Sequence, residues 1–372
     1  MTGTAISRRA SWRDRLLTEP RFQHWIARIP LLRAFARPHA RALFALCSGF
    51  IHSQVLYASV KLGLLEALND GPLSIAELQR RCALNEAAMR LLLSATDSLG
   101  LTELRRQQMR GLGLLGAALL GNPAVLQMIR HQPLFYADMA DPIALLRGTA
   151  APGELSAYWG YANHQAPEAL DENAVGEYTR LMAATQSLVA EDVIRAYDFG
   201  RHRCLLDVGG GDGSFLRALA PRVPRLALML FDLPAVTACA QTSLAAAGLS
   251  ARVEIRSGDF HTDALPAGAD VITLVRIVHD HDDRAAELLL RGVRRALPPG
   301  GRVVIAEPMR AVPGSLPAAE NYLGFYLLAM RQGRVRSRAE LQSLLLRAGF
   351  SSVRAHHTAR PWQCALLSAG RA

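Results

Sequence analysis

The fold is decided by one stretch of the sequence, Leu205-Leu206-Asp207-Val208-Gly209-Gly210-Gly211-Asp212-Gly213-Ser214-Phe215. Apolar residues lead to Asp207, glycines then alternate at positions 209, 211 and 213, and an apolar run follows. This pattern predicts a strand, a tight turn and the start of a helix. Glycine suits such a turn because it accepts a positive φ and lets a ligand approach the backbone N–H groups. We therefore predict that the turn binds a ligand.

The segments after the turn indicate which ligand. The spacing differs from the dinucleotide fingerprint, which needs a glycine where Ser214 stands. A second predicted strand, 226–231, ends at Asp232, where a carboxylate can accept the hydroxyl groups of a ribose. A third, 253–256, leads to Asp259 and Phe260, an acid and a ring that could hold adenine. Alone, the glycine turn also fits a structural turn or an NAD site. Together, the three segments favour S-adenosylmethionine (SAM).

Length and composition suggest two domains in a protein without disulfides. The chain has 372 residues, half of them hydrophobic, which is enough for two cores. Its five cysteines form neither a CxxC pair nor a cluster with histidine, so we expect reduced thiols, no metal site and a cytoplasmic location. We recognise no cleavable signal peptide. Polar residues or proline interrupt the apolar windows 42–60 and 111–128, so a membrane span is not expected.

The net charge of +10 is concentrated at the N-terminus. Residues 1–42 contain nine arginines against two acidic residues, interleaved with bulky apolar side chains such as Trp12 and Trp25. We treat 1–40 as a basic arm. Such a pattern suits peripheral contact of residues 8–38 with the anionic cytoplasmic face of a membrane, or packing on a dimer partner. Nucleic acid is not expected to bind, because the rest of the chain is nearly neutral.

Residues 41–170 are predicted to form a helical domain of the winged-helix type. Apolar periodicity indicates helices at 58–68, 74–82 and 85–99. The third has one arginine and one glutamate between residues 85 and 95, so a protein-protein surface is favoured over DNA binding. The segments 133–147 and 157–165 are aromatic and could line an apolar substrate pocket, although core packing also explains them. A connecting helix, 174–197, should deliver the chain into the catalytic domain, 171–372.

A second polar group follows the predicted fourth strand. The apolar run 272–278 leads into His279-Asp280-His281-Asp282-Asp283, at the sheet edge where open α/β proteins carry out their chemistry. We predict that His279 is a general base. The fifth strand ends at Glu307, whose carboxylate would orient the imidazole. His281 and the acids Asp280, Asp282 and Asp283 are expected to cap the next helix, 284–296, with Asp282 or Asp283 near its N-terminus. The final pair of strands would complete a seven-stranded sheet.

Between residues 40 and 370 the sequence resembles the plant-type O-methyltransferases, typified by caffeic acid and isoflavone enzymes. The resemblance implies a class I SAM-dependent methyltransferase sheet, an N-terminal winged-helix dimerisation domain and a homodimer. It makes His279 the catalytic base and Glu307 one of two flanking glutamates. The second glutamate should lie in Gly333-Arg334-Val335-Arg336-Ser337, where Val335 stands instead. The candidate cofactor-binding residues are Asp207, Gly209, Gly211, Asp232, Leu233, Asp259, Phe260 and Arg276.

Within that family, three segments resemble bacterial enzymes that methylate hydroxyneurosporene or demethylspheroidene, which are acyclic carotenoids. The segments are 231–236, 275–283 and 325–334. The resemblance implies methylation of a tertiary hydroxyl on a long apolar substrate in carotenoid biosynthesis. Three alternatives keep the same SAM residues: an O-methyltransferase of a phenolic or polyketide product, a C-methyltransferase of a bacteriochlorophyll precursor, and a SAM-binding regulator without catalysis.

Overall fold

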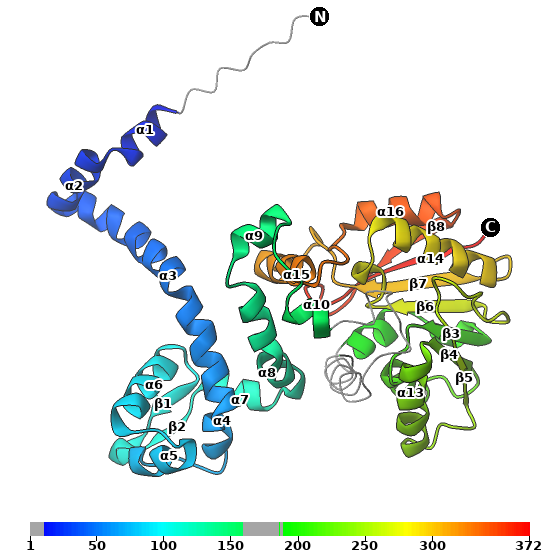
Figure 1. Cartoon of the computed structure of the whole chain (residues 1–372), viewed down its shortest axis with the longest axis horizontal. Coiled ribbons are helices and arrows are strands. Elements are labelled where there is room, and N and C mark those ends of the chain that lie inside the picture. The colour runs from blue at the N-terminus through cyan, green and yellow to red at the C-terminus, as the bar shows by residue number, and fades with distance from the viewer. Residues whose placement is uncertain (1–10, 159–185, 187–188) are drawn as a thin grey trace, which may run out of the picture. The chain divides into compact units, whose positions relative to one another are not determined.

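The computed structural model describes residues 11–158, 186 and 189–372 (Figure 1). The chain divides into two compact units between Gly121 and Asn122. The boundaries expected near residues 40 and 170 therefore do not coincide with this division, and residue 170 itself lies outside the described residues. The reason is that the helices after residue 121 pack on α15 (Pro317–Met330) of the second unit. These helices are α8 (Pro123–Asp138), α9 (Pro142–Arg147) and α10 (Glu154–Tyr158).

The second unit contains the predicted seven-stranded sheet, in the order β5-β4-β3-β6-β7-β9-β8. The five strands from β5 to β7 are parallel, whereas β9 runs antiparallel to both β7 and β8. The strands are β3 (Cys204–Val208), β4 (Ala227–Asp232), β5 (Val253–Ser257), β6 (Val271–Val275), β7 (Arg302–Glu307), β8 (Ser351–His356) and β9 (Ala365–Gly370). The predicted class I SAM-dependent methyltransferase fold is confirmed.

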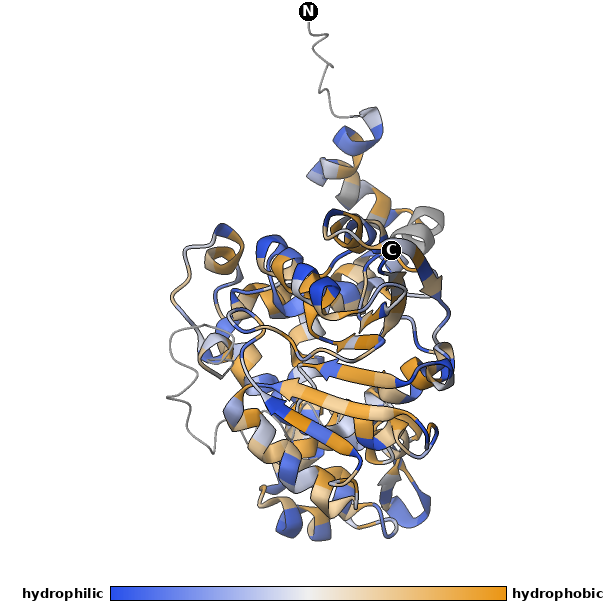
Figure 2. Cartoon of the chain, turned by 90° about the vertical axis from the view of Figure 1, so that its right-hand side faces the viewer, coloured by the Kyte–Doolittle hydropathy of each residue, from blue (hydrophilic) through white to orange (hydrophobic). Residues whose placement is uncertain are grey.

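Helices cover both faces of this sheet because successive strand residues point to opposite sides. Leu205 packs in the cluster that includes α12 (Ser214–Leu219) and α13 (Pro234–Ala246). Its neighbour Leu206 packs in the cluster that includes α14 (Asp283–Ala296) and α16 (Arg338–Arg347). Strands buried on both faces are apolar almost throughout, and Figure 2 shows the strands of the central sheet largely in orange. Their polar residues are therefore concentrated at the strand ends.

The first unit confirms the predicted helical domain. Ser74 and Asn85 cap α5 and α6 by accepting from backbone N–H groups, as their positions before apolar runs predict. Leu64, Leu78 and Met89 lie in its core. A short antiparallel pair of strands follows. The elements are α1 (Trp12–Thr18), α2 (Pro20–Arg28), α3 (Pro30–Lys61), α4 (Leu64–Ala67), α5 (Ile75–Cys82), α6 (Glu86–Ser98), β1 (Thr102–Leu104), β2 (Arg110–Leu112) and α7 (Leu114–Leu120).

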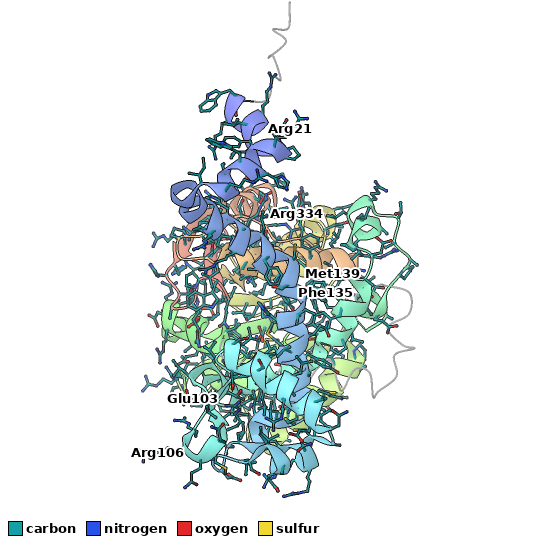
Figure 3. All side chains as sticks on the ribbon, turned by 90° about the vertical axis from the view of Figure 1, so that its left-hand side faces the viewer. Arg21, Glu103, Arg106, Phe135, Met139 and Arg334 are labelled. Carbon is teal, nitrogen blue, oxygen red and sulfur yellow. The ribbon has the colours of Figure 1, made fainter. Side chains whose placement is uncertain are left out.

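The described part of the basic arm, from residue 11 onward, is helical and continues into a long helix. Trp12 and Trp25 are exposed on α1 and α2, and Arg21 lies on α2 (Figure 3). Within α3, the segment Arg37–Lys61 is long and apolar enough to cross a membrane by length and composition alone. The apolar window 42–60, where a membrane span was not expected, lies in this segment and meets the length and composition of a span despite its polar residues. Among the described residues of α3, the exposed large apolar side chains are Leu43, Phe44, Leu46, Phe50 and Ile51.

Candidate functional site

The glycine turn after β3 has the backbone that its sequence predicts. Gly209, Gly211 and Gly213 have φ values of +69°, +59° and +79°, which L-residues with a Cβ rarely adopt. A Cβ at Gly209 would lie 2.4 Å from Ile277 Cδ1, whereas one at Gly211 would meet no heavy atom within 4 Å. Gly209 is therefore needed for packing, and the open side of the turn lies at Gly211.

Asp232, at the end of β4, is held by the same turn. Its two carboxylate oxygens accept hydrogen bonds from the N–H groups of Gly211 at 2.8 Å and Leu233 at 2.7 Å. Although the side chain keeps some exposed surface, burial of the carboxylate raises the pKa of Asp232 to about 6. The two backbone hydrogen bonds act in the opposite direction and lower this pKa. The proposed ribose carboxylate is thus oriented before any ligand binds.

Asp207 is a buried carboxylate beneath the turn. Its Oδ1 accepts from Thr273 Oγ1 at 2.6 Å, but Oδ2 is buried and no described residue hydrogen-bonds to it. Burial, opposed by the Thr273 bond, raises the pKa of Asp207 to about 7. An unsatisfied buried carboxylate oxygen is costly unless a polar or cationic ligand compensates it. The site therefore fits a ligand with a positive charge, such as the sulfonium or the ammonium group of SAM.

Asp259 and Phe260 follow β5, beside the end of β4. Gly258 donates its N–H to the Asp232 carbonyl at 2.9 Å, which places the two strand ends side by side. Asp259 Oδ1 accepts from the His261 N–H at 2.8 Å, and Phe260 is partly buried, with its ring edge-on to His281 at 5.4 Å. The structure thus brings both residues to the predicted edge of the sheet, and their contact with adenine stays a prediction.

His279 lies in the short 3-10 helix η5 (Val278–Asp280) that follows β6, 6% exposed. Its Nδ1 is 3.5 Å from Glu307 Oε2, and its Nε2 is 3.2 Å from Asp280 Oδ1. Glu307 Oε2 also accepts from the His279 backbone N–H at 2.9 Å. The 3.5 Å contact does not form a hydrogen bond, so Nδ1 has no hydrogen-bond partner among the described residues. His279 is therefore placed between two carboxylates.

The pKa of His279 reflects the competition between burial and these carboxylates. Burial disfavours the imidazolium, but the charges of Asp280 and Glu307 outweigh it and hold the pKa of His279 above its ordinary value. The predicted pairing with Glu307 is therefore present in the geometry. Asp280 was expected to serve the next helix. That role belongs to Asp282, which accepts from the Ala285 N–H at 2.7 Å and caps α14.

Two other candidate residues flank this turn. Arg276 has a φ of +61°, a strained value for arginine, and its N–H donates to Ala306 of β7 at 2.7 Å. It is charged close to His279 and opposes the imidazolium. Val335, where the resemblance to the family led us to expect a second glutamate, packs in an apolar cluster with α15. The two carboxylates near His279 are instead those of Asp280, which follows β6, and Glu307, the last residue of β7.

The aromatic residues proposed as a substrate pocket pack between helices. Phe135 projects from α8 (Figure 3) and contacts Tyr322 and Tyr326 of α15 edge-on, each with ring centroids 5.4 Å apart. His131 Nε2 is 2.7 Å from the Tyr326 hydroxyl, and burial lowers the pKa of His131 to about 4. The aromatic content of α15 was not singled out from the sequence. Residues 159–165 of the second aromatic segment lie outside the described residues.

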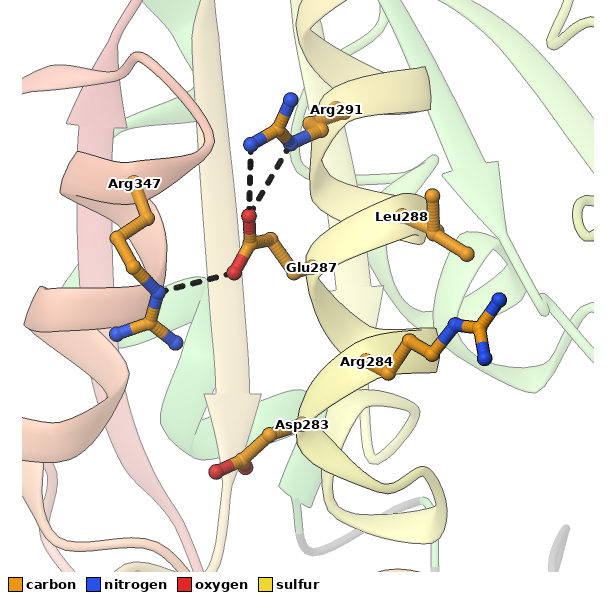
Figure 4. Close-up of a pocket in the computed structure, with 6 residues that line it drawn as sticks. All are labelled: Asp283, Arg284, Glu287, Leu288, Arg291 and Arg347. Carbon is orange, nitrogen blue, oxygen red and sulfur yellow. Dashed lines mark hydrogen bonds and ion pairs between the residues drawn. The ribbon is translucent and has the colours of Figure 1, made fainter.

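A separate surface pocket lies between α14 and α16 (Figure 4). Its central carboxylate, Glu287, accepts from Arg291 at 2.8 Å and Arg347 at 2.9 Å, so its charge is already compensated within the protein. The pocket does not include His279 or the glycine turn. In the described part of the chain, no group of three or more His, Cys, Asp or Glu residues could hold a metal ion.

The candidate residues thus come from the carboxyl ends of five adjacent parallel strands. From β5 to β7 these ends carry Asp259 and Phe260, which are predicted to hold adenine, Asp232, which is predicted to hold the ribose, and then the glycine turn, His279 and Glu307. Such a sheet with this site defines a SAM-dependent methyltransferase.

The comparisons with known proteins give the family. The chain belongs to the O-methyltransferase family: residues 136–351 match its O-methyltransferase domain, and 44–113 match its dimerisation domain. The protein is therefore a SAM-dependent O-methyltransferase, and its dimerisation domain supports the predicted homodimer.

Two curated relatives and one solved structure illustrate the similarity. The chain is 43% identical to the demethylspheroidene O-methyltransferase of Cereibacter sphaeroides, over 96% of this chain and 94% of that protein. It is 38% identical to the protein of the same name from Rhodobacter capsulatus, over 98% and 90% respectively. The S-adenosylhomocysteine-bound structure of CalO1, a methyltransferase in calicheamicin biosynthesis, aligns with a TM-score of 0.74 at 26% identity, covering 90% of this chain and 98% of that chain. These matches confirm the predicted family, and the bound product supports SAM as the co-substrate.

Proposed function

We propose that the protein methylates the tertiary hydroxyl of an acyclic hydroxycarotenoid in carotenoid biosynthesis. The observation that carries this proposal is the near full-length identity of 43% and 38% to two demethylspheroidene O-methyltransferases. The aligned residues make up 96% and 98% of the chain and therefore extend into both units. A phenolic acceptor is the main alternative, because the same SAM residues would serve it.

SAM, when bound, supplies a methyl group on a sulfonium sulfur that a hydroxyl oxygen can attack. In our proposal Asp232 accepts the ribose hydroxyls, since its carboxylate already faces the open side of the glycine turn. Asp259 and Phe260 hold the adenine, and Leu233 and Gly211 contribute backbone N–H groups beside Asp232. The unsatisfied oxygen of Asp207 compensates positive charge on the ligand. Arg276 shapes the wall next to His279.

His279 is proposed to accept the hydroxyl proton on its imidazole ring. An alkanol is about as acidic as water, with a pKa about nine units above that of imidazole, so full deprotonation first would cost roughly 12 kcal/mol. The proton must therefore leave as the C–O bond forms or afterwards. Asp280 and Glu307 favour this step because they stabilise the imidazolium. Most of the rate would come from holding the two reactants in line.

The test is transfer of labelled methyl from SAM by the purified protein. A detergent-dispersed hydroxylated acyclic carotenoid and a simple catechol are offered in parallel, and His279→Ala serves as the control for transfer at the proposed site. Label in the carotenoid ether, lost in His279→Ala, is the expected result. Label only in the catechol would overturn the carotenoid proposal and move the protein to the phenolic alternative.

We also propose that the basic arm places the enzyme on the cytoplasmic face of the membrane, where an apolar substrate would dissolve. Trp12, Leu17 and Trp25 are exposed on short helices among arginines, which suits an interfacial segment. The protein should co-float with vesicles containing anionic phospholipid, less so at high salt, and a Trp12→Ala/Trp25→Ala variant should bind more weakly. Equal binding to neutral vesicles would contradict the electrostatic part, and no co-flotation at low salt would refute membrane contact.

A further inference from the structure

The loop between α15 and α16 binds the backbone of the turn that carries His279 at several carbonyl groups. Arg336, between α15 and α16, donates from Nη1 to the Val278 carbonyl at 2.8 Å and from Nη2 to the His281 carbonyl at 2.7 Å. The Arg334 backbone N–H donates to the His279 carbonyl itself at 2.9 Å. Three of the four carbonyls from 278 to 281 are therefore bound by residues 334–336.

Arg336 is unusual because it is 0% exposed. Burying a guanidinium is unfavourable unless its donors are satisfied, and here Nε also donates to Asp283 Oδ1 at 2.9 Å. Every hydrogen bond described for this side chain ends on the His279 turn or on the first residue of α14. All the hydrogen bonds described for the Arg336 side chain thus hold this one segment of the chain.

The loop that carries Arg336 is itself anchored. The Arg310 N–H, just beyond β7, donates to the Arg336 carbonyl at 3.0 Å, and Ser337 starts α16 with a reciprocal capping box. Gly333 approaches the turn so closely that a Cβ there would lie 2.0 Å from the His279 carbonyl oxygen. The backbone that carries Arg336 is therefore held in place. Through its hydrogen bonds, the guanidinium in turn holds the backbone of the His279 turn in place.

We propose that Arg336 is a positioning residue for His279, which it holds between Asp280 and Glu307 through the backbone of the η5 turn. In this chain the loop that would supply a second glutamate has Val335 at that position and contributes main-chain support instead. The inference deepens the proposed role of His279 and rests on it. It predicts that loss of the guanidinium loosens the turn without altering the SAM site.

The test compares Arg336→Met, Arg336→Lys and a matched control, Arg252→Met. Arg252 also donates to three backbone carbonyls, those of Ala220, Val223 and Leu226, at 2.9 to 3.3 Å. These lie before β4 and β5 begin, at the opposite edge of the sheet from His279. The control therefore removes the same kind of contact from a place with no proposed role in transfer.

We expect Arg336→Met to lower kcat by about tenfold or more, with the Kd for SAM within twofold of the wild type, and Arg336→Lys to recover part of the loss. The acid limb of the kcat profile should shift to lower pH, because the imidazole leaves its two carboxylates. Arg252→Met should keep both kcat and the pH profile. Equal kcat losses in Arg336→Met and Arg252→Met, with no shift of the limb, would overturn the inference.

Hydrogen exchange of the SAM-free protein gives a readout that does not depend on activity. Peptides covering residues 277–283 should exchange faster in Arg336→Met and Arg336→Lys, whereas Arg252→Met should affect only residues 220–226. Unchanged exchange at 277–283 in both Arg336 variants would refute the inference. The proposed function fails by a different result, namely that the wild type methylates no carotenoid. Should Arg336→Met not fold, the same comparisons are made with Arg336→Lys.

Discussion

Replacing Asp207 with asparagine should stabilise the SAM-free protein at alkaline pH while weakening SAM binding. The amide oxygen can still accept from Thr273 Oγ1, so the packing beneath the glycine turn is preserved. What is lost is the negative charge on an oxygen that no described residue satisfies. A carboxylate that binds a ligand is expected to lower the stability of the protein while it raises the affinity for that ligand.

The magnitude follows from the pKa of Asp207, which burial raises from 3.8 to about 7. Between these values the native state keeps a proton that the unfolded chain has released, so stability falls as pH rises through this window. At about 1.36 kcal/mol per pKa unit, this group lowers the free energy of unfolding by about 2–3 kcal/mol between pH 5 and pH 8. Asparagine does not titrate and avoids this loss.

The assay is urea denaturation of the SAM-free protein at pH 5 and pH 8, at one protein concentration because the protein is predicted to be a dimer. The stability of Asp207→Asn relative to the wild type should increase by about 2–3 kcal/mol from pH 5 to pH 8. Glu287→Gln is the control: hydrogen bonds from Arg347 and Arg291 keep the pKa of Glu287 below its ordinary value, so its difference from the wild type should stay constant from pH 5 to pH 8. Parallel pH dependences of Asp207→Asn and the wild type would refute the reasoning.

Three further predictions concern the site. His279→Ala should lower kcat by about 10²–10⁴-fold with an almost unchanged Kd for SAM, and equal losses in both would contradict its role as base. Asp232→Asn should weaken SAM binding by about tenfold or more in calorimetry, the scale of one charge-assisted hydrogen bond, while kcat at saturating SAM changes little; a lower kcat with unchanged affinity would argue against a ribose contact. Because its carboxylate neighbours hold the pKa of His279 above 6.5, and because the base must be neutral, kcat should rise with pH through a midpoint above 6.5. Glu307→Gln should move this midpoint to lower pH, and a fixed midpoint would exclude the pairing.

The strand ends were predictable because their signals are local. Alternating glycines, acids at the ends of β4 and β7 and just after β5, and apolar runs of strand length define the edge of the sheet that carries the site. The junction between α8 and α9 also had a local signal, Asp141 before Pro142, which is a helix start that we did not use. The domain division at Gly121 was harder to predict from the sequence, because it depends on α8 to α10 packing against α15, a helix almost 200 residues later.

Arg336 and Asp280 show why the rest could not be predicted. An arginine in a run of arginines is expected at the surface, and only tertiary structure reveals that this one is buried against backbone carbonyls. Asp280 belongs to an acidic run in which every residue could cap the next helix. Its side chain faces His279 because β6 ends at Val275 and a 3-10 helix begins at Val278, a change of direction that apolar periodicity does not predict.

The hydrogen bonds that join the strand ends are expected to slow repeated turnover of the enzyme. The Gly211 N–H binds the Asp232 carboxylate, the Gly258 N–H binds the Asp232 carbonyl and the Gly209 N–H binds that of Phe231, so groups of the protein itself hold the strand ends together. In our proposal this site recognises adenine and ribose, which are the same before and after the methyl group departs. We therefore expect the spent co-substrate, S-adenosylhomocysteine, to compete strongly with fresh SAM. The enzyme's output would then depend on how quickly other reactions clear this by-product.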